Sequence, residues 1–179
     1  MRVIAGEFRS RRLKSLEGLE TRPTPDRLRE SLFSILAPRL TGAVFVDAYA
    51  GTGAGGIEAL SRGAGRVLFL ENSIVALKVI EDNLHSLGIG NRGTVVKGRV
   101  VSSLRKHCES ASIVFLDPPY EEAGEYTDAL EWLGENPPEL VVVQHHPKRV
   151  LAEVFGELRR TRLVKQGDNA LSFYEGRLR

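Results

Sequence analysis

The residues most suggestive of chemistry follow an apolar run near the middle of the chain. In "IVFLDPPYEEA", residues 113–123, four apolar residues lead into Asp117, Pro118, Pro119 and Tyr120. An ionised aspartate only accepts hydrogen bonds, and proline offers a carbonyl oxygen without a competing N–H donor. An acceptor-rich corner of this kind suits a group that brings two N–H donors, such as the exocyclic amino group of a base. Tyr120 would offer a flat face to a base that has left its stack.

Such a corner could activate the amino group that it binds. If both N–H donors were held out of the plane of the base, the nitrogen lone pair would leave conjugation and point at a methyl group. Catalysis would then depend on positioning and electrostatics, without a strong general base. The alternative is an ordinary turn that ends a strand, with Asp117 capping the helix that follows.

A glycine-rich turn lies earlier in the chain, in "VDAYAGTGAGGIEAL", residues 46–60. Gly51, Gly53 and Gly56 match the pattern G-x-G-x-x-G, and Glu71 ends the next apolar run, 20 residues after Gly51. Glycines allow the tight turn and the close approach of a ligand, and the acid can bind ribose hydroxyls. The pattern favours an adenosine-containing cofactor; the alternative is simple packing of a helix on a strand.

The residue that precedes this turn bears on which cofactor binds. A pyrophosphate favours a helix N-terminus free of negative charge, whereas here the strand ends in Asp47. A carboxylate suits a ligand with a positive amine, and S-adenosylmethionine carries both an amine and a cationic sulfonium. Asp47 therefore favours S-adenosylmethionine, while the glycines alone leave an NAD enzyme open.

Alternating strands and helices would position both segments. Short continuous runs rich in Val and Ile predict strands covered on both faces, and their alternation with helices predicts a doubly wound, mostly parallel α/β sheet. Two strand-like runs within 157–178 predict a C-terminal antiparallel hairpin, and residues 1–15 a β-hairpin extension. Thr24 and Pro25 suit the N-cap and the first position of a helix. The remaining predicted strands are 43–50, 66–72, 94–98, 112–117 and 139–145, and the helices are 26–37, 55–63, 74–88, 100–107 and 123–135.

Composition limits the class of protein. The 179 residues are 42% hydrophobic, enough for one core, and the formal net charge is only +2. Positive charge is concentrated at the N-terminus, where a local patch could meet phosphate even though the chain is nearly neutral. One cysteine, Cys108, forms no disulfide framework, and no apolar run reaches the roughly 20 residues of a membrane span. We expect a cytoplasmic protein. The N-terminal patch comprises Arg2, Arg9, Arg11, Arg12 and Lys14, against Glu7.

Several segments together resemble one known family. The segments are "RVIAGEFRSRRL", "RPTPDRLRESLF", "AGTGAGGIEALSRGA", "DPPY" and "GDNALSFYE". They resemble the bacterial guanine-N2 methyltransferases of 16S ribosomal RNA, from about Arg2 to Tyr174. The first two segments restrict the resemblance to this family, because Asp-Pro-Pro-Tyr alone is shared by many amino-group methyltransferases.

The resemblance implies a seven-stranded class I methyltransferase fold that binds S-adenosylmethionine and acts on ribosomal RNA or the small ribosomal subunit. Residues 26–179 would form the methyltransferase domain, with residues 1–25 as a basic hairpin and connector belonging to it. The site residues carried over fall into three groups. Cofactor binding is implied for Thr24, Asp47, Ala50, Gly51, Thr52, Gly53, Glu71 and Asn72; catalysis for Asp117, Pro118, Pro119 and Tyr120; and substrate binding for Arg9, Arg11, Arg12, Arg22 and Tyr120.

One departure from the family pattern leaves a question open. Arg99 follows the third predicted strand, where many such enzymes have an acid or amide near the adenine, so adenine recognition would depend on backbone groups and apolar packing. His145 and His146 point to opposite faces of a strand, and we expect no metal. The same chemistry on DNA, transfer RNA or a protein glutamine remains an alternative, as does a non-catalytic RNA-binding assembly module. We expect a monomer.

Overall fold

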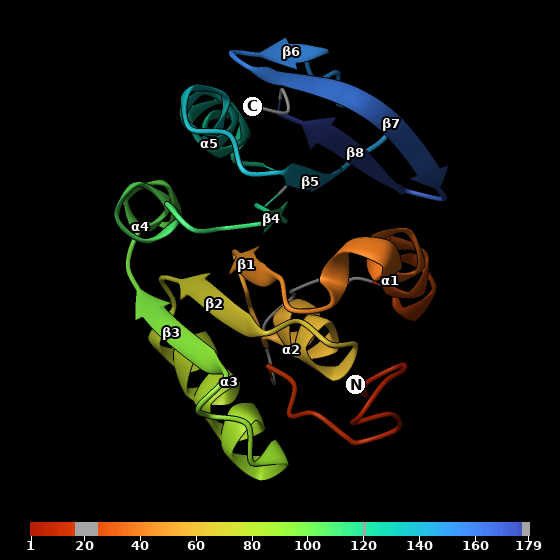
Figure 1. The fold of residues 1–179 in the computed structure, drawn as a ribbon, viewed down its shortest axis with the longest axis vertical. Coiled ribbons are helices and arrows are strands. Elements are labelled where there is room, and N and C mark those ends of the chain that lie inside the picture. Colours follow the sequence, from red (N-terminus) through yellow and green to blue (C-terminus); the bar gives the residue numbers. More distant parts are fainter. Residues whose placement is uncertain (17–24, 120, 177–179) are drawn as a thin grey trace.

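A computed structural model describes residues 1–16, 25–119 and 121–176 (Figure 1). The predicted order of core elements is confirmed. The helices are α1 (Asp26–Leu40), α2 (Ala54–Ser61), α3 (Ile74–Leu87), α4 (Val100–His107) and α5 (Ala123–Glu135). The strands are β1 (Val44–Ala48), β2 (Arg66–Glu71), β3 (Gly93–Lys97), β4 (Ile113–Leu116), β5 (Leu140–His145), β6 (Val154–Phe155), β7 (Leu158–Gln166) and β8 (Asn169–Glu175).

The strands form one sheet in the order β3-β2-β1-β4-β5-β8-β7-β6. Strands β1 to β5 are parallel, and β8 joins β5 in the antiparallel sense with β7 beside it. The doubly wound fold with a C-terminal antiparallel hairpin is therefore confirmed. An eighth strand, β6, was not predicted: it has two residues and pairs with β7, too short to leave a periodic signal.

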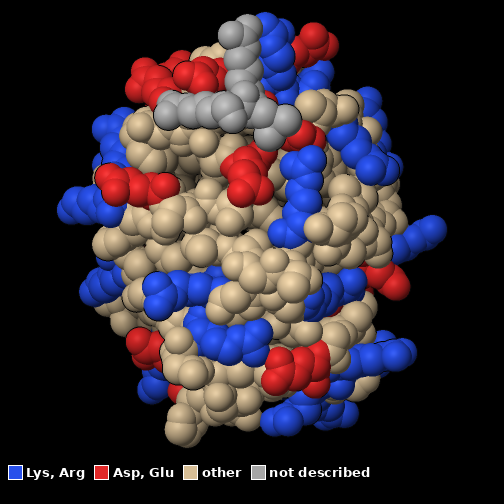
Figure 2. All heavy atoms as spheres, in the orientation of Figure 1, with Lys and Arg blue, Asp and Glu red and all other residues tan. Residues whose placement is uncertain are grey.

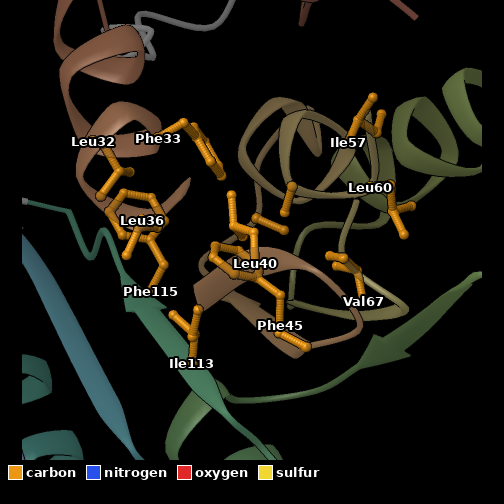
Figure 3. Packing of buried hydrophobic residues seen from close by; sticks show 14 of the residues in the cluster. Leu32, Phe33, Leu36, Leu40, Phe45, Ile57, Leu60, Val67, Ile113 and Phe115 are labelled. Atoms are coloured by element: carbon orange, nitrogen blue, oxygen red, sulfur yellow. The ribbon is translucent and has the colours of Figure 1, made fainter. Parts of the chain in front are cut away.

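Alternation along the strands divides the core between the two faces of the sheet. On β4, Ile113 and Phe115 belong to one buried cluster, together with side chains of α1, α2 and α3. Val114 and Leu116 belong to the other cluster, together with α4 and α5. Figure 3 shows side chains of α1 and α2 packed over β1, β2 and β4 on the first face. Burial on both faces explains why these strands read as continuous apolar runs.

The N-terminal segment, residues 1–16, packs against α2 instead of forming the two predicted strands. A single antiparallel bridge joins Arg2 to Arg12. Further along, the backbone N–H groups of Ile4 and Ala5 donate to the carboxylate of Glu58, at 2.8 and 3.0 Å. Because α2 satisfies these donors, the segment needs no longer strand ladder.

The start of α1 differs from the prediction by one position. The helix begins at Asp26, so Pro25 occupies the N-cap and not the first helical turn. Thr24, the predicted N-cap, lies outside the described residues. None of the helices that the structure describes combines the length and apolarity needed to cross a membrane.

Close packing of α2 on β2 requires a glycine at position 56. A Cβ there would lie 2.3 Å from Phe69 Cε1 and 2.7 Å from Val67 Cγ1, both buried. We expect Gly56→Ala to lower the free energy of unfolding by about 1–3 kcal/mol, as overpacked cores do. Gly124→Ala on α5 is the matched control, because its Cβ would meet nothing within 4 Å. Urea unfolding of both variants tests this, and equal stabilities would contradict the packing argument.

Candidate active site

A cleft of about 940 Å³ lies at the carboxyl ends of β1, β2 and β4 and is closed on one side by the first turns of α1. Nine of the residues predicted to form the site line it: Asp47, Ala50, Gly51, Thr52, Glu71, Asn72, Asp117, Pro118 and Pro119. The predicted site residues Arg22, Thr24 and Tyr120 lie outside the described residues. The structure thus brings the glycine turn and the Asp-Pro-Pro corner into one cleft, as expected for ligands at a topological switch point.

The backbone conformations of the glycine turn are ones that favour glycine. Gly51 and Gly53 have φ of +56° and +77°, in the left-handed region, where glycine carries no steric penalty. Gly53 is the N-cap of α2 and does not itself line the cleft. Tyr49 also has a positive φ, +65°, which is uncommon for a residue with a side chain. The chain therefore reverses within a few residues of leaving β1.

Asp47 is a buried carboxyl group on the floor of the cleft. Its side chain is 3% exposed, and its Oδ2 accepts a hydrogen bond from the Gly56 N–H at 2.7 Å. Burial raises the pKa of Asp47 to about 8; the Gly56 N–H opposes this, and the negative charges of Asp117 and Glu71 add to it. A cation bound in the cleft would favour the ionised form of this group.

Three backbone N–H groups hold the carboxylate of Glu71. Gly51 N donates to Oε2 at 2.8 Å, and Asn72 N and Ser73 N each donate to Oε1 at 2.9 Å. These bonds join the glycine turn to the start of α3. A carboxylate has about four acceptor positions, so Glu71 can still accept from a ligand hydroxyl.

The Asp-Pro-Pro corner directly follows β4. Asp117 is half-buried, and its N–H donates to Ala48 O at 3.3 Å, which fixes the corner against β1. The Pro118 carbonyl accepts from the Tyr126 hydroxyl at 3.2 Å and retains a second lone pair. The corner therefore carries two acceptor groups, the Asp117 carboxylate and the Pro118 carbonyl.

Several polar residues that line the cleft were not assigned a role from sequence, among them two linked pairs and a buried arginine. The Tyr49 hydroxyl hydrogen-bonds to Glu125 on α5, which joins the glycine turn to the helix after the corner. Gln144 of β5 and Asn169 of β8, both buried, lie with Nε2 and Oδ1 3.5 Å apart. Arg29 is buried in the first turn of α1. In the sequence, each of these residues is only a polar residue within an apolar pattern. Such a pattern does not predict which side chain it will contact.

Arg99 lies at the rim of the cleft. Its side chain is 84% exposed, and its Nη2 is 4.0 Å from Glu125 Oε1. The strand before it, β3, ends without an acidic side chain facing the cleft. The expectation that adenine recognition uses backbone and apolar groups stays a prediction.

The N-terminal basic side chains lie outside the cleft, and Arg11 Nη2 donates to Ser86 O near the C-terminal end of α3, at 3.1 Å. Met1, Ser15 and Leu16 line the cleft, whereas Arg9, Arg11 and Arg12 are exposed and absent from its lining. Phe8, which directly precedes Arg9, is buried in the core. Lys and Arg side chains spread over the face shown in Figure 2, with acidic side chains between them. Any attraction for phosphate is thus local.

The sheet order and this cleft define a class I methyltransferase. The chain belongs to the family described as Conserved hypothetical protein 95, whose pattern matches residues 1–175. YlbH of Bacillus subtilis, an rRNA methyltransferase by name, is 32% identical over 185 residues, 99% of this chain and 100% of YlbH. These matches span the N-terminal segment as well as the sheet.

Two further relatives come from Escherichia coli. Ribosomal RNA small subunit methyltransferase D is 39% identical over 120 residues, which are 67% of this chain and 60% of that protein, less than two thirds of its length. The solved structure of yhhF, a methyltransferase by name, superposes with a TM-score of 0.83 at 31% identity and covers 98% of this chain and 97% of yhhF.

Across the ranges that the structure describes, no three His, Cys, Asp or Glu residues form a group suited to a metal ion.

The raised pKa of Asp47 makes stability depend on pH. Folding lifts this pKa from 3.8 to about 8, so the folded chain binds an extra proton between these values, and stability of the ligand-free protein falls as pH rises. This contribution has a slope of at most about 1.4 kcal/mol per pH unit. Asp47→Asn, which keeps an acceptor for Gly56, should flatten the fall in urea midpoint between pH 5 and 7. Asp128→Asn, at an exposed position of α5, is the control; identical pH profiles for all three proteins would contradict the argument.

Proposed function

We propose that this protein transfers the methyl group of S-adenosylmethionine to the N2 amino group of a guanine in small-subunit ribosomal RNA. The observation that carries the proposal is the meeting of a cofactor-type glycine turn and an Asp-Pro-Pro acceptor corner in one cleft. The names of the relatives that match this chain, two of them rRNA methyltransferases, support the choice of ribosomal RNA.

The cofactor half of the cleft suits a ligand with positive charge and ribose hydroxyls. Asp47 lies behind the turn formed by residues 50–53, where its carboxylate would accept from the amine of the methionine portion. Glu71 is fixed by backbone N–H groups and would accept from the ribose hydroxyls, with Asn72 beside it. When bound, S-adenosylmethionine would supply an electrophilic methyl group.

The target half of the cleft suits an amino group. The Asp117 carboxylate and the Pro118 carbonyl would accept the two N–H bonds of guanine N2 and turn its lone pair toward the methyl donor. The Tyr126 hydroxyl would hold that carbonyl in place from behind. Stacking of the guanine on Tyr120 remains part of the proposal. The proton that N2 loses on methylation would pass along its hydrogen bond to the Asp117 carboxylate. The reaction would thus use preorganised acceptors, and no residue need be a strong base.

Ribosomal RNA would approach over the N-terminal segment. The exposed guanidinium groups of Arg9, Arg11 and Arg12 lie on a segment whose two ends border the cleft. They would contact phosphates and position the RNA without reading its sequence. Arg22, implied as a further substrate contact, belongs to the same proposal.

The direct test offers radiolabelled S-adenosylmethionine with unmodified small ribosomal subunits, free ribosomal RNA, transfer RNA and DNA in parallel. Digestion then identifies the labelled nucleoside. We expect N2-methylguanosine from the ribosomal samples. If label appeared only in transfer RNA or only in DNA, that nucleic acid would be the substrate in place of ribosomal RNA. If the cofactor bound but no nucleic acid were labelled, the search would turn to protein substrates.

Asp117 should be required for transfer and not for cofactor binding. We expect Asp117→Ala to lower kcat by about 10²–10³-fold, the cost of removing one preorganised group, with the Kd for S-adenosylmethionine nearly unchanged. Glu121→Gln is the matched control, because this exposed acid lines the same cleft but follows the corner. Transfer and calorimetric binding are measured on both variants. Full activity of Asp117→Ala would contradict the proposed mechanism.

The N-terminal arginines should contribute to RNA binding through charge. Replacing Arg9, Arg11 and Arg12 by Ala should weaken binding and reduce the slope of log K against log salt by roughly 2–3, since each phosphate contact contributes about 0.7–0.9. The matched control replaces Arg105 and Lys106 in the last turn of α4. Binding is measured across a salt series, and an unaltered slope in the triple variant would exclude this segment from the RNA site.

A further inference from the structure

A buried arginine lies within a cleft whose other charges are mostly negative. Arg29, in the first turn of α1, is 3% exposed and lines the cleft. The other lining arginine is the exposed Arg99. The acids that line the cleft are Asp26, Asp47, Glu71, Asp117, Glu121, Glu122 and Glu125. Arg29 is therefore the one deeply buried side-chain cation among the described lining residues.

The hydrogen bonds of Arg29 are incomplete. Its Nη2 donates to Asp26 Oδ1 at 2.9 Å and to Arg2 O at 2.8 Å, while its buried Nε has no hydrogen-bond partner. A buried donor without an acceptor is costly, so few such groups persist without a reason. Burial lowers the pKa of Arg29, and the charges of Asp26 and Glu58 oppose this. The guanidinium stays positive at neutral pH.

The contact with Asp26 shows that Arg29 can bind a carboxylate. The carboxylate of Asp26 already accepts from Arg29 at the edge of the cleft, yet its side chain is 57% exposed. An exposed carboxylate can return to solvent at little cost when another anion takes its place. The pair therefore provides a position where a ligand carboxylate could exchange with a carboxylate of the chain.

The charges of S-adenosylmethionine match this arrangement. Its sulfonium and amine are positive and suit the acids of the cleft, whereas its carboxylate requires a cation. We propose that Arg29 binds the methionine carboxylate of S-adenosylmethionine through its Nε and Nη2, and that this carboxylate replaces Asp26 at Nη2. The inference rests on the proposed function, and it adds a cofactor contact from the helix that closes the cleft.

The test removes the carboxylate from the ligand and the guanidinium from the protein separately. Calorimetry measures the Kd of S-adenosylmethionine and of decarboxylated S-adenosylmethionine, which keeps the sulfonium and an amine. We expect Arg29→Lys and Arg29→Met to weaken S-adenosylmethionine roughly tenfold to hundredfold, as loss of a hydrogen bond between charged groups does, and to leave the decarboxylated ligand nearly unchanged. Asp26→Asn should bind S-adenosylmethionine as tightly as the parent or several-fold more tightly.

The control separates ligand binding from structural support. Arg62 is also largely buried, pairs with Glu58 at 2.7 Å and lies outside the cleft lining. Arg62→Met should change the affinities of both ligands by the same factor, and thermal unfolding without ligand reports the stability of each variant. Equal weakening of both ligands in the Arg29 variants would overturn the inference and leave Arg29 as a support for Arg2. A parent protein that binds neither ligand would overturn the proposed cofactor, and the inference with it.

Discussion

The parallel pairing of β1 with both β2 and β4 is the constraint on which the site depends. In this register Ala48 lies opposite Leu70 of β2 and Leu116 of β4. Glu71, the last residue of β2, and Asp117, the first residue after β4, are the next residues after these partners, so both acids lie at the level where β1 ends. A shift of one residue in either pairing would turn the corresponding acid to the other face of the sheet. Core packing that fixes the register therefore also fixes the distances between functional groups.

Bringing three acids to one edge has an electrostatic cost. Burial and the neighbouring charges of Asp117 and Glu71 oppose ionisation of Asp47 and raise its pKa to about 8. A positively charged ligand would relieve this repulsion, so the same arrangement that disfavours the ligand-free charge state favours binding of a cation. The site gives up some stability of the free protein in exchange for selectivity toward such a ligand.

The N-terminal segment belongs to the same physical unit as the sheet. Val3, Phe8 and Leu13 enter the core cluster that contains α1 and α2, and Glu58 accepts two N–H groups of the segment. Arg29 reaches the carbonyl of Arg2 from the other side. The segment is thereby anchored at the edge of the cleft, and its exposed arginines are displayed from a fixed base.

The sequence by itself determined the order of elements, the glycine turn and the place of Asp117 at a strand end, because apolar runs, glycines and prolines act through neighbouring residues. It did not determine which distant side chains meet. The contacts of Tyr49 with Glu125 and of Gln144 with Asn169, and the burial of Arg29 beside Asp26, depend on helices and strands far apart in the chain. The N-terminal segment shows the same limit: residues 1–15 were predicted to form a β-hairpin, but Glu58 of α2 accepts from the Ile4 and Ala5 N–H groups, and the pairing is limited to one bridge between Arg2 and Arg12. Local patterns specify which elements form, and only packing decides which polar groups they bring together.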